Sequence, residues 1–277
     1  MLLFVPALTS HQILSPSVFI NALTGFIVFS LLSSSIYILN DIIDVEYDRK
    51  HPLNKTRPIA AGQLSTFSAY TVFFICFLAG SWLAMGLGTM FLFVAICYII
   101  LNLLYSYYLK MVIILDVVFL MSFYIIRLIA GQIPDAIPFS PWLLSFAIFL
   151  FFSLALLKRY VDIKVIRENK ISVISGRGYS IDDENVLMSL GVASGLISSL
   201  VLILYTDSEQ AQQFYNAPIF LIALTPVMFY WISRMWLLAA RGMIKSDPVV
   251  FAIKDKSSYA VTLCFLSMMF LAKYVAI

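Results

Sequence analysis

Eight runs of apolar residues, most of them about as long as a lipid bilayer is thick, follow one another along this chain. A membrane-spanning α-helix needs about 20 mostly apolar residues and satisfies every backbone hydrogen bond internally. The composition leaves few alternatives, since 62% of the 277 residues are hydrophobic and 12% are charged, whereas a soluble domain has about 25% charged residues. The sequence therefore predicts an all-α, polytopic integral membrane protein. The predicted spans cover residues 17–39, 67–86, 89–109, 112–131, 142–157, 186–205, 217–240 and 257–277.

The first residues of the chain, Met1–Leu8, are also apolar but are too few to cross a bilayer. They lack the charged flank, the longer apolar stretch and the small-residue cleavage site of a signal peptide. We interpret them as part of a first helix, which makes about nine helices in all. Either the start of the chain is missing or this first helix is a partial one. We expect a single transmembrane domain over residues 1–277.

The Lys and Arg residues are sorted between alternate loops of this topology. With the partial helix counted as the first, fifteen of the 18 basic residues lie in or beside the second, fourth, sixth and eighth connections. The other connections, which contain no Lys or Arg, are residues 9–16, 86–88, 132–141 and 206–216. Because basic loops tend to stay on the cytoplasmic side of the cell membrane, we expect the charged loops and any active site to face the cytoplasm. The net charge of +3 is too small to indicate a nucleic-acid partner.

The strongest local signal is a group of acidic residues at the cytoplasmic end of the second predicted helix. At about 100° per residue, four side chains with oxygen donors fall within about 100° of one helical face, and Glu46 points away. These four are Asn40, Asp41, Asp44 and Asp48. Carboxylates this close repel one another and require a compensating cation, and all-oxygen ligands suit Mg²⁺ bound to substrate phosphates. We predict a Mg²⁺–diphosphate site here; the alternative is a solvated acidic helix end.

The same stretch resembles a motif of a known family. Residues 40–48 are similar to the NDxxDxxxD motif of the UbiA superfamily of intramembrane prenyltransferases, and residues 57–62, Arg-Pro-Ile-Ala-Ala-Gly, are similar to its continuation. The family's NxxYSxxxK signature resembles Asn102, Tyr105, Ser106 and Lys110. The resemblance implies about nine helices around a central cavity with cytoplasmic cap loops. It also implies Mg²⁺-assisted departure of diphosphate from an activated carbon, followed by attack by an acceptor.

A departure from the usual family pattern lies at the end of the sixth helix. Members that prenylate aromatic acceptors place a second Asp-rich motif there, whereas this chain has Lys158, Arg159 and Asp162 within an arc of about 100°. Cations cannot hold a second metal ion, but they can hold another phosphate, and Arg suits bidentate contact. This pattern, together with Arg234 and the segment 241–255, resembles a smaller branch, the polyprenyl-phosphate phosphoribosyltransferases.

The resemblance implies a role for each of these residues. The implied Mg²⁺ ligands are Asn40, Asp41, Asp44 and Asp48. Asp162, which is implied to act in catalysis with Asp41 and Asp44, binds the ribose hydroxyls or metal. The implied substrate-binding residues are Lys158, Arg159, Arg57, Lys110, Tyr105, Arg234 and Arg241. Lys158 and Arg159 have an alternative role as anchors at the membrane interface, and Lys110 as a topology determinant.

Two basic residues lie within predicted spans. Arg127 is deep in the fifth helix and Arg234 is in the eighth, and intramembrane charges are costly unless they face a partner or a polar cavity. Asp116 lies on the same helical face as Arg127 but about three turns away, too far for a direct ion pair. Arg127 therefore either lines a cavity or pairs with a group on another helix.

These residues are compatible with three functions. We predict Mg²⁺-dependent transfer of 5-phosphoribosyl from phosphoribosyl diphosphate to a polyprenyl phosphate at the cytoplasmic leaflet. The second hypothesis is prenyl transfer to an aromatic acceptor, and Lys158 and Arg159 speak against it. The third is a transporter or scaffold, although the chain lacks the internal repeats common in transporters. The predicted partners are the membrane, a lipid-linked polyprenyl substrate and a diphosphate-bearing donor.

Overall fold

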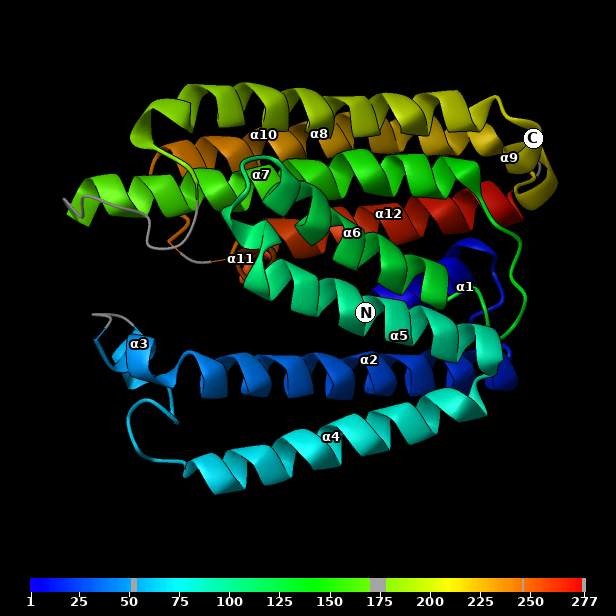
Figure 1. The fold of residues 1–277 in the computed structure, drawn as a ribbon. Helices are drawn as coiled ribbons and strands as arrows, with labels where there is room; N and C mark the ends of the chain where they lie inside the picture. The colour runs from blue at the N-terminus through cyan, green and yellow to red at the C-terminus, as the bar shows by residue number, and fades with distance from the viewer. Residues whose placement is uncertain (51–53, 170–177, 246, 276–277) are drawn as a thin grey trace. The chain divides into compact units, whose positions relative to one another are not determined.

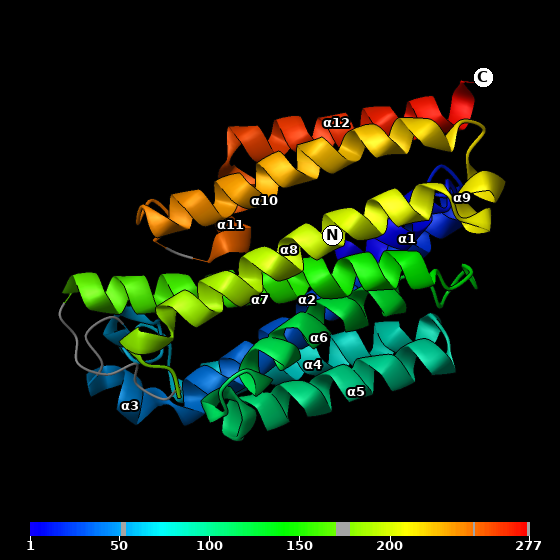
Figure 2. The same cartoon turned by 90° about the horizontal axis from the view of Figure 1, so that it is seen from above.

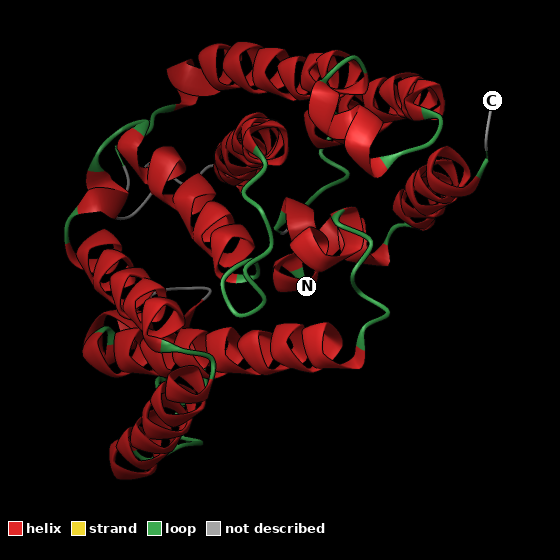
Figure 3. Ribbon diagram, turned by 90° about the vertical axis from the view of Figure 1, so that its right-hand side faces the viewer, coloured by secondary structure: helices red, strands yellow, loops and turns green. Residues whose placement is uncertain are grey.

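The computed structural model describes residues 1–50, 54–169, 178–245 and 247–275, and all regular secondary structure in these ranges is helical (Figure 3). The α-helices are α1 (Val5–Thr9), α2 (Pro16–Ile43), α3 (Val45–Lys50), α4 (Thr66–Gly86), α5 (Thr89–Tyr107), α6 (Leu115–Ala130), α7 (Pro141–Asn169), α8 (Glu184–Thr206), α9 (Glu209–Phe214), α10 (Leu224–Ala240), α11 (Pro248–Lys254) and α12 (Lys256–Tyr274). Short 3₁₀ helices cover Leu2–Phe4, Asn54–Thr56, Leu109–Met111, Ile181–Asp183 and Pro218–Ala223.

Six of the described helical segments are long and apolar enough to cross a membrane. They are Pro16–Ile43, Thr66–Gly86, Thr89–Tyr107, Pro141–Val165, Ile181–Thr206 and Pro218–Ala240. The two other predicted runs form α6 and α12, of 16 and 19 residues. Large apolar side chains lie exposed on these helices, for example Phe74 and Trp82 on α4, which are 54% and 74% exposed. Such surfaces are typical of helices that face lipid, and the predicted polytopic, all-α membrane fold is confirmed.

The chain divides into two compact units, each described here by itself. Unit 1 comprises Met1–Leu109 and Ile126–Phe139, and unit 2 comprises Lys110–Ile125 and Ser140–Ile277. In unit 1, α2 packs along α4 and also contacts α5, and α2 and α4 lie side by side in Figures 1 and 2. A Cβ atom at Gly80 would lie 3.0 Å from Leu32 Cδ2, so the small residue permits this close helix packing.

Unit 2 is centred on the packing of α7 against α8, with α10 on α8 (Figure 2). A Cβ atom at Gly191 would lie 2.1 Å from Trp236 Cζ2, so the indole of α10 fills the space that a larger residue of α8 would take. Ser153 of α7 donates a hydrogen bond to the Gly191 carbonyl at 2.6 Å and accepts one from Trp236 Nε1 at 3.1 Å. Small residues and a bridging hydroxyl thus hold three helices together, as is common between membrane helices.

Two helix ends differ from the predicted ones, and both carry candidate site residues. The second span continues beyond residue 39 to Ile43, where α2 stops, and α3 begins only at Val45. The stretch 40–48 is therefore interrupted at Asp44 and is not one continuous helix. Hydrogen bonds of the α-helical pattern, four residues apart, nevertheless continue across the break. Asp44 N donates to the Asn40 carbonyl, and Asp48 N donates to the Asp44 carbonyl. The predicted sixth helix, α7, continues to Asn169 and carries Lys158, Arg159 and Asp162 on its last turns.

Candidate functional site

The acidic end of α2 is organised around one guanidinium group in unit 1. Arg57 Nη1 lies 2.9 Å from Asp41 Oδ1 and 2.8 Å from Asp48 Oδ2. Asp48 is 2% exposed, whereas Arg57 is 41% exposed and reaches the pair from the surface. The buried side chain of Ile59, two residues after Arg57, packs with Ile42, the residue after Asp41. This packing places Arg57 beside the end of α2. The structure thus brings Arg57, predicted as a phosphate ligand, together with two of the predicted Mg²⁺ ligands.

Asn40 is held at the same helix end by a contact between helices. Its Nδ2 donates a hydrogen bond of 3.0 Å to Ser106 Oγ on α5. This bond ties the two predicted motifs together and leaves the amide oxygen as the atom that can bind a cation. Asn102, one turn earlier, donates instead to the Tyr98 carbonyl of its own helix at 2.8 Å. Tyr105 is partly buried on the last turn of α5.

The oxygen donors of this region fit a divalent cation by their charge. Asp41, Asp44 and Asp48 contribute three negative charges, and Arg57, which pairs with Asp41 and Asp48, offsets one. Asp44 is partly exposed, and Glu46 is exposed, as expected for a residue off the shared face. Within the described ranges no three His, Cys, Asp or Glu side chains converge on one point as metal ligands do. In this arrangement Arg57 occupies the place between Asp41 and Asp48.

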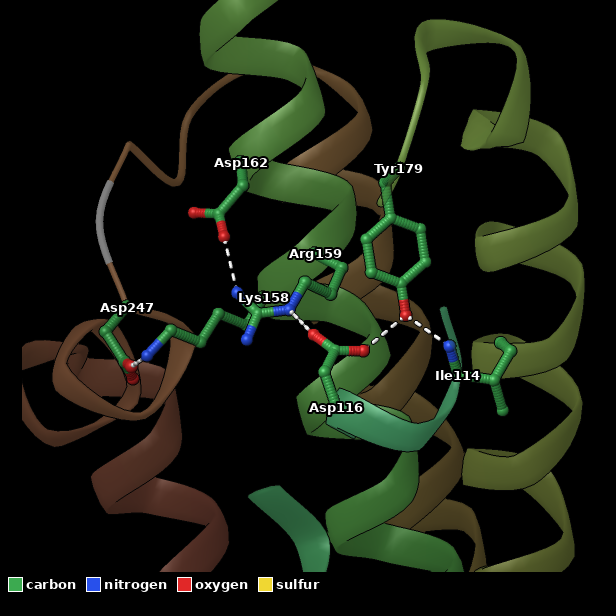
Figure 4. A network of polar contacts seen from close by, with 7 residues as sticks. All are labelled: Ile114, Asp116, Lys158, Arg159, Asp162, Tyr179 and Asp247. Atoms are coloured by element: carbon green, nitrogen blue, oxygen red, sulfur yellow. Dashed lines mark hydrogen bonds and ion pairs between the residues drawn. The ribbon is translucent and has the colours of Figure 1, made fainter. Parts of the chain in front are cut away.

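Unit 2 contains a buried polar network at the end of α7 (Figure 4). Arg159 is 1% exposed; its Nε donates to Asp116 Oδ2 on α6, and its Nη1 donates to Asp162 Oδ2 at 2.8 Å. Tyr179 donates from its hydroxyl to the other oxygen of Asp116 and accepts from Ile114 N at 2.9 Å. Burial and the hydrogen bond to Asp116 raise the pKa of the Tyr179 phenol, so it stays protonated and remains a donor.

The buried position of Arg159 differs from the exposed phosphate ligand that the sequence predicts. Two carboxylates already surround its guanidinium, and Asp116 is 0% exposed. Asp162 is the accessible end of the network, with 32% of its side chain exposed. A bound molecule would therefore contact Asp162, and not the buried guanidinium of Arg159.

Lys158, next to Arg159 on α7, pairs with a carboxylate from another part of the chain. Its Nζ lies 2.7 Å from Asp247 Oδ2, and Asp247 Oδ1 accepts from Val249 N, which caps α11 (Figure 4). Burial alone would raise the pKa of the Asp247 carboxyl, but the Lys158 ammonium and the backbone donors outweigh it and hold that pKa below its usual value. A small cavity beside the pair, of about 20 Å³, is lined by Leu120, Tyr124, Leu154, Ala155, Lys158, Asp247 and Val249.

The remaining predicted phosphate ligands lie in three different settings. Arg234 on α10 forms a two-pronged contact with Asp255, at 2.7 and 2.9 Å. The pKa of Asp255 is lowered: burial opposes this shift, but the hydrogen bonds from Arg234 and Ser258 exceed it. Arg241 is exposed at the C-terminal end of α10, and Lys110 is partly buried in the short helix Leu109–Met111.

Arg127 is paired across helices, one of the two predicted alternatives. Its Nη2 donates to Tyr98 Oη at 2.6 Å and to Ser33 Oγ at 3.1 Å, and its guanidinium lies 5.2 Å from the Tyr98 ring centroid. Asp116, which the sequence separates from Arg127, pairs with Arg159 instead.

The partners of the basic residues are what reasoning from the sequence missed. Asp116, Tyr179, Asp247 and Asp255 engage the predicted cations, yet none of the four is predicted as a site residue. For Asp116 a signal was present, because a carboxylate at the start of an apolar span requires a partner. For Asp247 the following proline indicates an N-cap, which places its carboxylate at the start of a helix.

Comparison with known proteins identifies the family. The model of the UbiA prenyltransferase family matches residues 1–241. The nodulation protein NoeC of Azorhizobium caulinodans is 30% identical over 93% of this chain and 83% of its own length. The uncharacterised protein y4nM of Sinorhizobium fredii is 36% identical over 85% of this chain, which spans 46% of that relative's length.

Two further similarities cover a shorter stretch of the chain or share fewer identical residues. The decaprenyl-phosphate phosphoribosyltransferase of Mycobacterium tuberculosis is 38% identical over 142 residues, 50% of this chain and 46% of that enzyme. A solved structure of digeranylgeranylglyceryl phosphate synthase shares the fold, with a TM-score of 0.61 over 96% of this chain and 89% of that one, at 15% identity. Because the family model matches residues 1–241 of 277, the chain belongs to the UbiA prenyltransferase family.

Proposed function

We propose that this protein is a Mg²⁺-dependent membrane transferase that moves 5-phosphoribosyl from phosphoribosyl diphosphate to a polyprenyl phosphate. One observation carries this choice within the family: Lys158-Arg159 stands where aromatic prenyltransferases have a second acidic motif, in a chain half of which is 38% identical to a decaprenyl-phosphate phosphoribosyltransferase. The remaining evidence, from the family and fold, supports a transferase with a lipid substrate in general.

In the proposed reaction, the acidic end of α2 receives the diphosphate of the donor. Asp41, Asp44, Asp48 and the amide oxygen of Asn40 would hold Mg²⁺, which neutralises charge on the departing diphosphate. Without the ion, the Arg57 guanidinium lies 2.8–2.9 Å from Asp41 and Asp48. With the ion bound, Arg57 would leave these carboxylates, and its partly exposed guanidinium would donate to a diphosphate oxygen. Arg57 thus compensates the cluster when the donor is absent and binds the donor when it is present.

For unit 2, taken by itself, we propose that the end of α7 provides contacts to a sugar and to a phosphate. The exposed carboxylate of Asp162 accepts hydrogen bonds from the ribose hydroxyls, and Lys158 exchanges Asp247 for a phosphate oxygen. An oxygen of the polyprenyl phosphate attacks the anomeric carbon as the bond from that carbon to the diphosphate oxygen breaks. The nucleophile is already ionised, so no general base is needed. Tyr105, Lys110, Arg234 and Arg241 are proposed contacts of the lipid phosphate or donor, at the cytoplasmic leaflet.

The experiment offers membranes that contain the protein two donor–acceptor pairs in parallel. One pair is labelled phosphoribosyl diphosphate with polyprenyl phosphate, and the other is labelled prenyl diphosphate with hydroxybenzoate. We expect label in the lipid fraction from the first pair, loss of that label with EDTA, and loss in Asp44→Asn. Incorporation of prenyl groups into hydroxybenzoate, with no ribose phosphate in lipid, would overturn the proposal in favour of aromatic prenyl transfer.

A further inference from the structure

We infer that Asp116 and Tyr179 are positioning residues that orient, through Arg159, the carboxylate of Asp162. The inference rests on the proposed function, in which Asp162 binds the ribose of the donor. It assigns a role to two residues that lie outside the motifs described above and come from segments before and after α7 in the sequence. Figure 4 shows the chain of contacts from Tyr179 through Asp116 and Arg159 to Asp162.

The contacts form one directed series of atoms. The Tyr179 hydroxyl donates to Asp116 Oδ1, Arg159 Nε donates to Asp116 Oδ2, and Arg159 Nη1 donates to Asp162 Oδ2. Both oxygens of Asp116 are therefore engaged, and Arg159 is held by two carboxylates in different directions. Exposure rises along the series, from 0% for Asp116 and 1% for Arg159 to 32% for Asp162. The buried members can reach a substrate only through the exposed one.

The charge of the series argues against a purely structural role for Asp162. Asp116 alone neutralises Arg159, and a buried ion pair of this kind needs no second carboxylate. Asp162 adds a negative charge on the accessible side, with 32% of its side chain exposed. Arg159 fixes one oxygen of that carboxylate at 2.8 Å, and carboxylates positioned in this way by neighbouring groups bind with a defined orientation.

The backbone around Tyr179 is built to hold this end of the series. Ile114 has φ +66°, a left-handed conformation that is costly for a β-branched residue, and its N–H donates to the Tyr179 hydroxyl. A Cβ atom at Gly178 would lie 2.8 Å from the Met111 carbonyl oxygen, so glycine allows the backbone of residue 178 to lie against Met111 and Ile113. The phenol is thereby fixed over the start of α6, where Asp116 lies.

A cycle of substitutions separates positioning from simple stabilisation. Asp116→Asn keeps the shape of the side chain and removes its charge, and Tyr179→Phe removes only the hydroxyl. We expect each to lower kcat/KM by about 10-fold to 100-fold, as misplacement of a reacting group does. Because both act through Asp162, neither should lower kcat/KM further when it is combined with Asp162→Asn. Ser153→Ala, which breaks a buried hydrogen bond between α7, α8 and α10, is the control: its effect should be the same with or without Asp162→Asn.

The outcomes distinguish this inference from the proposed function. Wild-type turnover with each donor pair tests the proposed function, and the cycle is then measured with whichever donor the wild type uses. Loss of coupling, with Asp116→Asn and Asp162→Asn lowering kcat/KM by multiplied factors, would overturn the positioning role. The positioning role would also be overturned if the activity of Tyr179→Phe fell only as its unfolding temperature fell, with no coupling to Asp162→Asn. Coupling on a prenyl donor would retain the positioning role while the phosphoribosyl assignment fails.

Discussion

At the scale of single residues, each buried or half-buried arginine has a different kind of partner. Arg57 bridges two carboxylates, Arg159 links a buried and an exposed one, and Arg127 donates to two hydroxyls and lies over an aromatic ring. The consequence of replacing each therefore depends on what is left behind. Spacing along the sequence predicts where these cations lie on a helix, but not whether a carboxylate or a substrate neutralises them.

Replacing Arg57 tests whether the acidic end of α2 accepts a divalent cation. Arg57→Gln leaves the buried Asp48 close to Asp41 without its cation, so we expect a loss of about 1–3 kcal/mol in the free energy of unfolding. Addition of Mg²⁺ should raise the unfolding temperature of Arg57→Gln more than that of the wild type, since the ion replaces the lost charge. Thermal unfolding of the purified protein in detergent, with Mg²⁺ or EDTA, measures both effects.

Arg49→Gln is the control for this comparison, because within the described residues the exposed Arg49 contacts the Ala60 carbonyl at a long 3.4 Å and is paired with neither Asp41 nor Asp48. It should unfold like the wild type under both conditions. If Mg²⁺ stabilised Arg57→Gln no more than Arg49→Gln, the carboxylates would not be a cation site.

Arg127 should be replaceable with little loss of stability. Arg127→Met retains the length of the side chain, and Tyr98 and Ser33 keep a hydrogen bond of 2.9 Å to each other, so no hydroxyl is left unsatisfied. We expect a change within about 1 kcal/mol, as for well-packed replacements of buried charges. A loss of several-fold that size in chemical or thermal unfolding would show that Arg127 holds a further anionic group.

At the scale of helices, the apolar runs predict the spans well, and the ends of the helices are less predictable. The interruption at Asp44 cannot be read from a regular spacing of polar residues, because the spacing is the same with or without a break. Likewise, α7 is longer than its apolar run because its charged last turns pair with other elements. Asp116 and Arg159 are 43 residues apart, and Lys158 and Asp247 are 89 apart, so only tertiary structure reveals these pairs.

Two carboxylates that cap α11 and α12 make the stability of unit 2 depend on pH. Asp247 and Asp255 have lowered pKa values in the folded protein, so their contribution is complete above the ordinary carboxyl pKa of about 4. It is lost as the pH falls through that value and then through the lower folded-state pKa, since protonation removes the pairing. We expect the unfolding temperature to fall on acidification from pH 6 to about pH 3.

Asp247→Asn separates the pairing with Lys158 from the helix cap, because Asn is also a good N-cap residue. This variant should be less stable than the wild type at pH 7 and should lose less stability on acidification. Parallel pH profiles of the two proteins would contradict the role assigned to the Lys158–Asp247 pair.

At the scale of the whole molecule, the distribution of charge predicts which loops share a side of the membrane. The membrane fold and the family follow from the apolar runs and motifs, and both are confirmed. The conformation of the candidate site is less accessible to sequence reasoning, since the same cations serve internal pairs in the structure. The roles assigned to the motif residues stay predictions, and the fold adds the partners of the basic ones.

The orientation is testable with single cysteines in a background that lacks Cys76, Cys97 and Cys264. Lys55→Cys lies in a loop predicted to be cytoplasmic, and Asp207→Cys lies in one predicted to be on the opposite side; both positions are exposed. A maleimide that cannot cross membranes should label position 207 in intact spheroplasts and position 55 only in inverted vesicles. The reverse pattern would place the acidic end of α2 on the outer side.

The most direct test of the central claim is the binding of phosphoribosyl diphosphate to the purified protein, titrated with Mg²⁺ and with EDTA. The account predicts binding that requires Mg²⁺, is lost in Asp44→Asn, and is weakened by Asp162→Asn. Binding of equal affinity in EDTA, or binding of prenyl diphosphate with none of phosphoribosyl diphosphate, would contradict it.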